Sequence, residues 1–217
     1  MRLLHAKADI EQNAGLKMIV TDTKLENPVS TRRFTYPSYY RREWRMKDGS
    51  AVVIRPIRPP DEPQMVEFHR SLSMSTVYLR YFSSMKLSTR TRHERLARIC
   101  RIDYQREIVL VADYKNPRHR KNQIIAVGRL SRLQNSNAAE IAVLVTDSCQ
   151  GKGLGTEILN RLLHIGRAAQ IERVIAEILP ENAVMKKINE KLDFPVEHIF
   201  EDGVIKANFD LKKNKRY

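Results

Sequence analysis

Cysteine is scarce in this chain of 217 residues, in which only Cys100 and Cys149 occur. Two isolated cysteines provide neither a disulfide framework nor the paired spacing of a metal site, which favours a reducing compartment and no metal cofactor. Long hydrophobic runs are also missing, and the longest falls far short of a membrane span. The N-terminus lacks the apolar core of a signal peptide. We therefore expect a cytoplasmic protein with no membrane partner.

Acidic residues are fewer than basic ones, 25 against 39, which gives a formal net charge of +14. Such an excess attracts phosphate-rich ligands, nucleic acid or acidic protein surfaces, and the charge alone does not say which. The basic residues are spread along the chain, and the simplest interpretation is a solvated surface. A nucleic-acid-binding function would require affinity that falls steeply with salt, and only the charge suggests it.

The stretch 150–155, Gln-Gly-Lys-Gly-Leu-Gly, stands between an apolar run and a helical pattern. Residues 141–145 have the length and composition of a buried strand. After the glycines, apolar residues recur at helical spacing, at Ile158, Leu159, Leu162, Leu163 and Ile165. Three glycines in five positions allow a tight turn and a close approach to a ligand. The N–H groups at the start of the helix then form an anion site that suits a pyrophosphate.

Two other phosphate-binding motifs do not fit this stretch. The P-loop needs Lys-Ser or Lys-Thr after its last glycine, and Leu154 and Gly155 break that pattern. The dinucleotide-binding fingerprint needs a third glycine where this chain has Thr156, and it opens an early strand–helix unit rather than a late one. A helix N-terminus that only requires a tight turn is the structural alternative.

The remaining patterns predict a mixed α/β chain. Asp48-Gly49 between two strand-like runs is a strong hairpin signal. The expected strands are 43–46, 51–57, 107–112, 124–133, 138–145, 174–179, 196–200 and 204–209. The expected helices start near Asp61, at residue 75, at Thr89 or Thr91, after the glycine stretch and at Ala183, the last of them running to Leu192. His69 falls on the apolar stripe of the first helix, where a packed histidine is the simpler interpretation than a catalytic one.

Gln150, Gly153 and Gly155 form the pattern Gln-x-x-Gly-x-Gly, which resembles the pyrophosphate loop of the GNAT acetyltransferases. Four further blocks resemble the GNAT domain of the Pat-type protein lysine acetyltransferases. They are Asp48-Gly49-Ser50 with residues 54–59, Leu79-Arg80-Tyr81-Phe82, Ile102-Asp103-Tyr104 with Arg106-Glu107, and Leu179-Pro180-Glu181-Asn182 through Leu192-Asp193-Phe194. The resemblance covers roughly residues 44–209.

This resemblance implies an α/β (α+β) GNAT fold, a mixed and mostly antiparallel sheet that is splayed at the acetyl-CoA site and flanked by helices. It assigns residues 44–217 to the acetyltransferase domain and 1–43 to an N-terminal extension or linker. In that subgroup the domain often follows an acyl-CoA synthetase-like region, and residues 16–26 look like the closing strand of its ATP-grasp-like part. The extension is therefore interpreted as a remnant of such a region, without its function.

Acetyl transfer to lysine needs a general base, because roughly one free amine in a thousand is unprotonated at neutral pH, an obstacle of about 4 kcal/mol. The predicted strand 138–145 contains one acidic residue, Glu140, on the same face as Ala142 and Leu144. The pattern alone leaves open that Glu140 only begins the strand at the solvent edge. The Pat-type base is a glutamate at this place, so the resemblance implies Glu140 as the base, acting through one water.

The same resemblance implies the residues that hold acetyl-CoA. Backbone N–H groups between Ala142 and Val145 are expected at the thioester, which includes those of Leu144 and Val145. The phosphates are expected on the main chain of Gln150, Gly151, Lys152, Gly153, Leu154, Gly155 and Thr156. Asn182 is expected to bond the pantetheine arm, with Lys152 and Arg161 adding positive charge. Many GNAT enzymes have a tyrosine acid in the last helix, but residues 183–192 contain none, so the acid is unassigned.

The resulting hypothesis is an acetyl-CoA-dependent N-acetyltransferase that acts by direct attack on a protein lysine, with acyl-CoA synthetases as the expected acceptors. One alternative is an enzyme that acetylates a small amine, which a narrow acidic acceptor pocket would favour. Another is a non-catalytic CoA-binding sensor, which would bind CoA without turnover. Acetyl-CoA is the co-substrate in the enzymatic readings.

Overall fold

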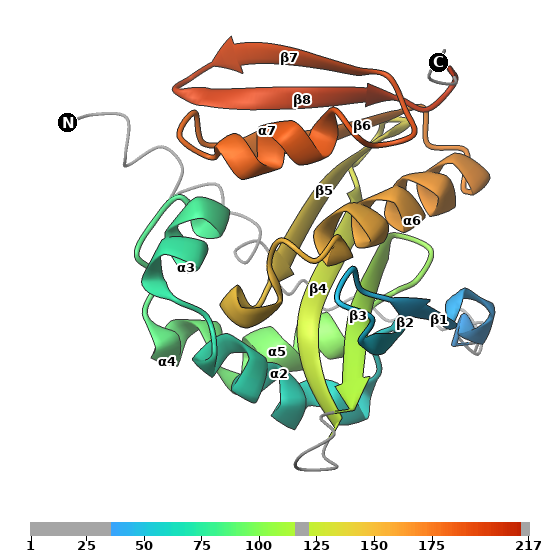
Figure 1. Cartoon of the computed structure of the whole chain (residues 1–217). Coiled ribbons are helices and arrows are strands. Elements are labelled where there is room, and N and C mark those ends of the chain that lie inside the picture. The colour runs from blue at the N-terminus through green and yellow to red at the C-terminus, as the bar shows by residue number, and fades with distance from the viewer. Residues whose placement is uncertain (1–35, 116–121, 214–217) are drawn as a thin grey trace, which may run out of the picture. The chain divides into compact units, whose positions relative to one another are not determined.

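The computed structural model describes residues 36–115 and 122–213. Residues 16–26, which resemble a closing strand, and most of the predicted N-terminal extension lie outside these residues. Eight strands form one sheet in the order β1-β2-β3-β4-β5-β6-β8-β7 (Figure 1). Their bounds are β1 Arg42–Arg45, β2 Ala51–Pro56, β3 Glu107–Lys115, β4 Asn122–Arg132, β5 Ala138–Val145, β6 Arg173–Ile178, β7 Val196–Glu201 and β8 Val204–Asp210. β5 and β6 are parallel and the other neighbours are antiparallel, so the predicted mixed α/β sheet is confirmed.

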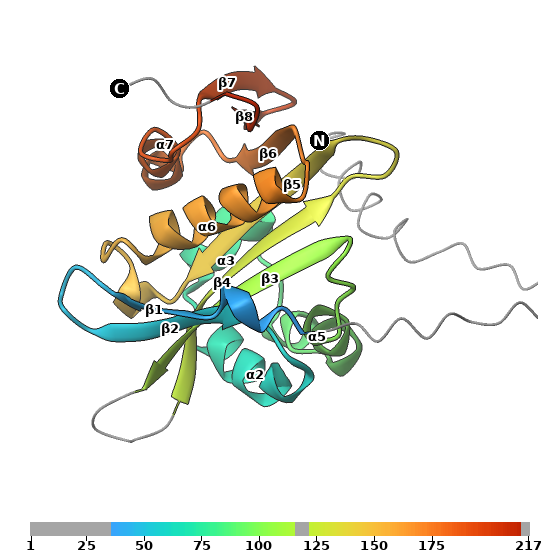
Figure 2. The ribbon, with the colours of Figure 1, turned by 90° about the vertical axis from the view of Figure 1, so that its right-hand side faces the viewer.

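Helices cover both faces of the sheet (Figures 1 and 2). They are α2 Glu62–Arg70, α3 Met74–Tyr81, α4 Leu87–Arg90, α5 His93–Cys100, α6 Leu154–Ala168 and α7 Ala183–Asn189, with short 3-10 turns at Ser38–Tyr40, Pro59–Asp61 and Asp147–Cys149. Side chains of α2, α3 and α5 pack with Val109, Val111 and Leu144 on one face. α6 packs with Leu110 and Ile141 on the other. In the described residues, no helix has the length and apolar character needed to cross a bilayer.

Alternation along the strands divides the apolar residues between these two cores. Leu110 and Ile141 belong to the α6 side, whereas Val109 and Leu144 belong to the side of α2 and α5. This is the period of two expected for strands that are covered on both faces.

The helix α6 approaches the sheet closely over Gly128 of β4. A Cβ atom at this position would lie 2.2 Å from Cγ2 of Ile158 and 2.9 Å from Cδ1 of Leu162. Both distances are too short for a contact between two non-bonded carbon atoms. Packing, rather than backbone conformation, therefore requires glycine at this position. Ile158 and Leu162 are fully buried, and they occupy the space that a side chain on β4 would take.

Two helix boundaries differ from the sequence prediction. The last helix was expected to reach Leu192, but α7 ends at Asn189. A turn follows, in which Lys191 N–H donates to Ile188 O, and it directs Leu192 into the core, where it is 1% exposed. The third predicted helix, expected to start at Thr89 or Thr91, corresponds to α5, which begins at His93, and the short helix α4 before it was not predicted.

The described part of the predicted linker packs against the sheet. Tyr36 donates a hydrogen bond from its hydroxyl to Pro56 O at 2.9 Å. Its ring also meets Tyr104 edge-on, with ring centroids 6.2 Å apart. These contacts join the segment before β1 to the far end of β2. The predicted boundary between residues 43 and 44 stays a prediction.

His69 gives a pH-dependent contribution to stability. It is 2% exposed, and burial, aided by the positive charges of Arg90 and Arg95, lowers its pKa from 6.5 to about 4. Between these two pH values the unfolded chain binds more protons than the folded one. The contribution of His69 to the free energy of unfolding is therefore largest above pH 6.5 and falls as the pH drops towards 4. The difference is worth about 3 kcal/mol.

We expect His69→Leu to remove most of this acid-induced loss, measured by urea unfolding at pH 7 and pH 4.5. His198→Gln is the matched control, since His198 is exposed on β7, and it should follow the wild-type profile. Equal loss of stability in the wild type and His69→Leu would show that other groups titrate in this range.

Candidate active site

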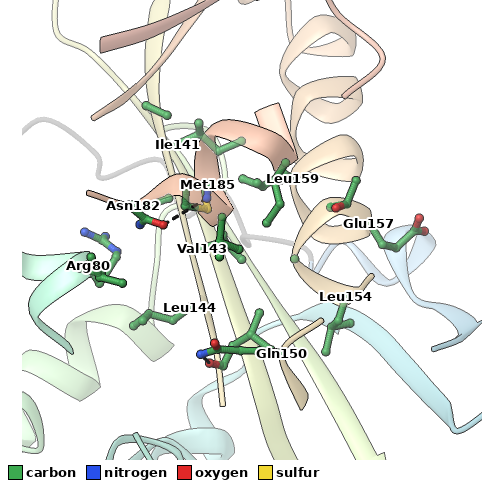
Figure 3. Close-up of a pocket in the computed structure, with 18 of the residues that line it drawn as sticks. Arg80, Ile141, Val143, Leu144, Gln150, Leu154, Glu157, Leu159, Asn182 and Met185 are labelled. Carbon is green, nitrogen blue, oxygen red and sulfur yellow. Dashed lines mark hydrogen bonds between the residues drawn. The ribbon is translucent and has the colours of Figure 1, made fainter. Parts of the chain in front are cut away.

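A cavity of about 810 Å³ opens between β5 and β6. Its walls also include the glycine loop with the first turn of α6, and residues of α3 and α7. Figure 3 shows Val143 of β5, Arg80 of α3 and Asn182 at the start of α7 around this space. The predicted site residues that line it are Glu140, Leu144, Val145, Gln150, Gly151, Gly153, Leu154, Gly155, Thr156 and Asn182.

The cavity exists because β5 and β6 diverge. Their parallel pairing joins Ala138 to Arg173 and ends where Glu140 meets Ile175. Beyond that pair, β5 continues to Val145 in register with β4, and β6 continues in register with β8. Each strand therefore keeps one partner and leaves its other edge without a ladder over the rest of its length.

The register of β4 with β5 determines which backbone groups face this opening. Thr146 N–H donates to Ile125 O at 2.9 Å, in the same register as the β4–β5 pair. Hydrogen-bonded residues alternate along an antiparallel strand, so Leu144 pairs with β4, whereas Val143 and Val145 direct their backbone groups to the β6 side. The geometry narrows the expected thioester donors to the N–H groups of Val143 and Val145.

The glycine loop has the conformation that its sequence suggests. Gly151 and Gly153 have φ values of 74° and 85°, which glycine adopts without strain. Glu157 N–H makes the first helical bond of α6, to Gly153 O at 3.1 Å. The N–H groups of residues 154–156 therefore have no acceptor within the helix. These three residues line the cavity, at the positive end of the helix dipole.

Gln150 connects this loop to two other elements. Its side-chain amide donates to Val145 O at 3.1 Å and to the hydroxyl of Thr76 at 3.0 Å. The Gln150 side chain therefore ties the end of β5 to α3. Gln150 is part of the Gln-x-x-Gly-x-Gly pattern, but that pattern did not predict its contact with α3.

Asp147 fastens the N-terminus of α3 beside the glycine loop. Its carboxylate accepts from Ser73 N–H at 2.9 Å, from the Ser73 hydroxyl and from the Thr76 hydroxyl at 2.8 Å. Burial raises the pKa of Asp147, but these hydrogen bonds outweigh it and hold the pKa below its usual value. α3 is thereby placed so that Thr76, Leu79 and Arg80 line the cavity.

Glu140 is the last residue of β5 that pairs with β6, at the point where these two strands separate. It is exposed and lines the cavity, so it is both at the solvent edge and inside the proposed site. Ser131 of β4 is its cross-strand neighbour. Arg129, which also lines the cavity, pairs with Glu107 at 2.5 Å. The role of Glu140 as a base stays a prediction.

Asn182 caps α7 from the opposite wall. Its Oδ1 accepts Met185 N–H at 3.1 Å, the contact drawn in Figure 3. The side chain is largely buried and lines the cavity, so its amide nitrogen is the atom that can donate to a ligand.

Two predicted cations have partners within the protein. Lys152 Nζ lies 2.9 Å from Asp48, and neither Lys152 nor Arg161 is among the described residues that line the cavity. Arg161 Nε lies 2.7 Å from Glu157, one turn earlier on α6. Both cations are therefore held in place by carboxylates of the protein itself.

A model of the acetyltransferase (GNAT) domain family matches residues 51–195 of this chain. The chain belongs to the GNAT acetyltransferase family. Three features of the structure agree with the resemblance found in the sequence. They are the order of the strands in the sheet, the separation of β5 from β6 and the glycine turn before α6.

Relatives confirm the resemblance to Pat. Acetyltransferase Pat of Mycolicibacterium smegmatis is 28% identical over 148 residues, 68% of this chain and 42% of that protein. This chain thus spans less than half the length of that relative. An acetyltransferase of Pseudomonas aeruginosa is 26% identical over 145 residues, 66% of this chain and 74% of its own length.

Solved structures agree with the fold. The crystal structure of the GNAT domain of S. lividans PAT has a TM-score of 0.70 at 26% identity, covering 81% of this chain and 99% of that one. A putative acetyltransferase of Salmonella typhimurium, solved with its cofactor acetyl-CoA, has a TM-score of 0.54 at 19% identity, covering 76% and 97% of the two chains. This second similarity concerns the fold alone.

No tyrosine lines the cavity among the described residues, and α7 contains none. The hydroxyl groups that do line it belong to Thr76, Ser131 and Thr156. The structure thus offers no tyrosine where many GNAT enzymes have their acid, in agreement with the sequence.

Proposed function

We propose that this chain is a cytoplasmic acetyl-CoA-dependent N-acetyltransferase that modifies a lysine of a protein, with acyl-CoA synthetases as the acceptor class. One observation carries the proposal. The glycine loop, which suits a pyrophosphate, and Glu140, which suits a base, line one continuous cavity at the point where the sheet splits. The choice of acceptor class rests on the resemblance of the sequence to the Pat-type acetyltransferases.

The acetyl-CoA site extends from α6 to β5. The phosphates accept hydrogen bonds from the N–H groups of residues 154–156, and Asn182 donates to the pantetheine arm. The adenosine diphosphate part of acetyl-CoA thereby stays at the α6 end of the cavity, and the thioester reaches the open edge of β5. There the N–H groups of Val143 and Val145 donate to the carbonyl oxygen, on which negative charge develops during attack.

The chemical step is direct attack of the amine on the thioester carbon. Glu140 accepts a proton from the lysine ammonium through one water, and the amine then forms the new C–N bond. Collapse of the tetrahedral intermediate breaks the C–S bond and releases CoA. The nitrogen gives up its second proton to water as the amide forms, and water passes a proton to the leaving thiolate, since a thiol of ordinary pKa needs no dedicated acid.

The surroundings of the cavity suit a protein acceptor better than a small amine. Val184 of α7 lines the cavity and is 67% exposed, and Met74 and Tyr78 of α3 are 54% and 41% exposed. Apolar side chains on the two helices that border the opening provide contact area for a polypeptide.

Transfer of radiolabelled acetyl groups tests the proposal. Incubation of the chain with labelled acetyl-CoA and a purified acyl-CoA synthetase should place label on a lysine of the synthetase, mapped by mass spectrometry. Polyamines are the small-amine control and should accept at a rate at least tenfold lower. Preferential labelling of the polyamine would contradict the protein acceptor, and CoA binding without any transfer would contradict the enzymatic function.

A further inference from the structure

The turn between β1 and β2 lies directly against the glycine loop, although about 100 residues separate them in sequence (Figures 1 and 2). Lys47 N–H donates to Lys152 O at 3.1 Å. Lys152 Nζ in turn pairs with Asp48 at 2.9 Å. The hydrogen bond from Lys152, with others from Ser50, lowers the pKa of Asp48 to about 2, so this link stays charged throughout the neutral range.

The side chain of Lys47 lies over the residue that caps α6. A Cβ atom built on Gly153 would lie 3.5 Å from Cε and 3.6 Å from Cγ of Lys47, and 3.5 Å from Cη2 of Trp44. These are ordinary van der Waals contacts, so the hairpin covers the space above the glycine without a clash. Both Lys47 and Trp44 line the cavity together with Gly153.

The charge around the loop leaves a specific role for Lys47. The two cations close to the glycine loop in sequence are Lys152 and Arg161, and they are paired with Asp48 and Glu157. Among residues 36–115 and 122–213, no carboxylate lies within ion-pair distance of Lys47. Its ammonium is therefore available beside a group of backbone N–H donors that face an anion.

We infer that Lys47 binds the pyrophosphate of acetyl-CoA, so that the β1–β2 turn closes over the phosphates from the side opposite α6. This inference rests on the proposed function. The α6 amides hold one side of the pyrophosphate through hydrogen bonds, and the Lys47 ammonium neutralises the other. Asp48 and Lys152 position the turn, which gives Lys152 an indirect part in binding through its ion pair.

Binding of CoA and of shortened analogues to the full chain tests the role of Lys47. Trp44 is the single tryptophan of the chain and lines the cavity, so its fluorescence reports on occupancy. We expect Lys47→Met to raise the Kd for CoA about tenfold, the effect of losing one charge-assisted contact. The Kd for 3′-dephospho-CoA should rise by the same factor, because it keeps the pyrophosphate, and the Kd for S-acetylpantetheine should not change.

Arg42→Met is the matched control, because it removes one positive charge from the same hairpin at an exposed residue that does not line the cavity. Its Kd for CoA should stay within twofold of the wild type, and Lys47→Arg should retain most of the affinity. Equal Kd values for Lys47→Met and Arg42→Met would overturn the inference. A loss confined to CoA, with dephospho-CoA unaffected, would also overturn it, because the contact would then be to the 3′-phosphate. A wild-type chain that binds no CoA would overturn the proposed function as well.

Discussion

Replacement of Glu140 by glutamine is expected to lower kcat by about two to four orders of magnitude while the Kd for acetyl-CoA stays unchanged. Glutamine has the size of glutamate but cannot accept the proton of the attacking ammonium. The contacts proposed for the phosphates come from other residues that line the cavity, on the glycine loop and the first turn of α6. The measurement is the rate of thiol release under saturating acetyl-CoA, combined with a separate binding titration.

Glu197→Gln is the matched control for this experiment. The cross-strand pairs Glu140–Ile175, Ile175–Asn208 and Asn208–Glu197 form one row, so Glu197 lies on the same face of the sheet two strands beyond β6. It is exposed and does not line the cavity, and its replacement should leave kcat unchanged. Wild-type turnover in Glu140→Gln would refute the assignment of the base. A large rise in the Kd for acetyl-CoA would instead give Glu140 a role in binding.

Arg55→Met is expected to lower the free energy of unfolding by about 3–5 kcal/mol. Arg55 forms two hydrogen bonds to Asp61, at 2.6 and 2.9 Å, and a third to Asp113 at 2.8 Å. The side chains of Arg55 and Asp61 are 4% and 1% exposed. Burial lowers the pKa of Arg55, but the two carboxylates outweigh it and raise the pKa above its usual value. Loss of the guanidinium would leave Asp113 without its cation, and it would leave the buried Asp61 with only the longer ion pair to Arg58.

The comparison for this variant is Arg58→Met. Arg58 lies 3.6 Å from the same Asp61, but its side chain is 48% exposed. Solvent screens this pair, so its removal should cost less than about 1 kcal/mol. Urea unfolding of both variants gives the two values. A loss below about 1 kcal/mol for Arg55→Met would show that the core around Asp61 rearranges to restore its hydrogen bonds.

The sequence predicted best the parts of the fold that are determined by neighbouring residues. Residues 138–145, the glycine turn and α6 follow one another directly, and apolar spacing with turn chemistry was enough to find all three. The α/β class and the family followed from them. The site residues themselves remain predictions, although all of them except Lys152 and Arg161 line one cavity.

Contacts between distant segments could not be predicted in the same way. Asp147 and Thr76 are 71 residues apart, and each has an unremarkable sequence context. The pairing of Lys152 with Asp48 on the first hairpin could not be predicted either, because these two residues are far apart in sequence. The end of α7 was also misjudged, since Leu192 continues the helical pattern but is drawn into the core by a turn.

Gly128 of β4 also affects the geometry of the site, because it determines how close α6 lies to the sheet. Because no side chain separates β4 from Ile158 and Leu162, the axis of α6 runs low over the sheet at that point. The helix α6 is continuous over fifteen residues. The height of its middle above β4 therefore also sets the height of its first turn above the open edge of β5. A bulkier residue at position 128 would lift that turn, and the span between the phosphate anchor and the reacting carbonyl would no longer match the fixed length of a pantetheine arm.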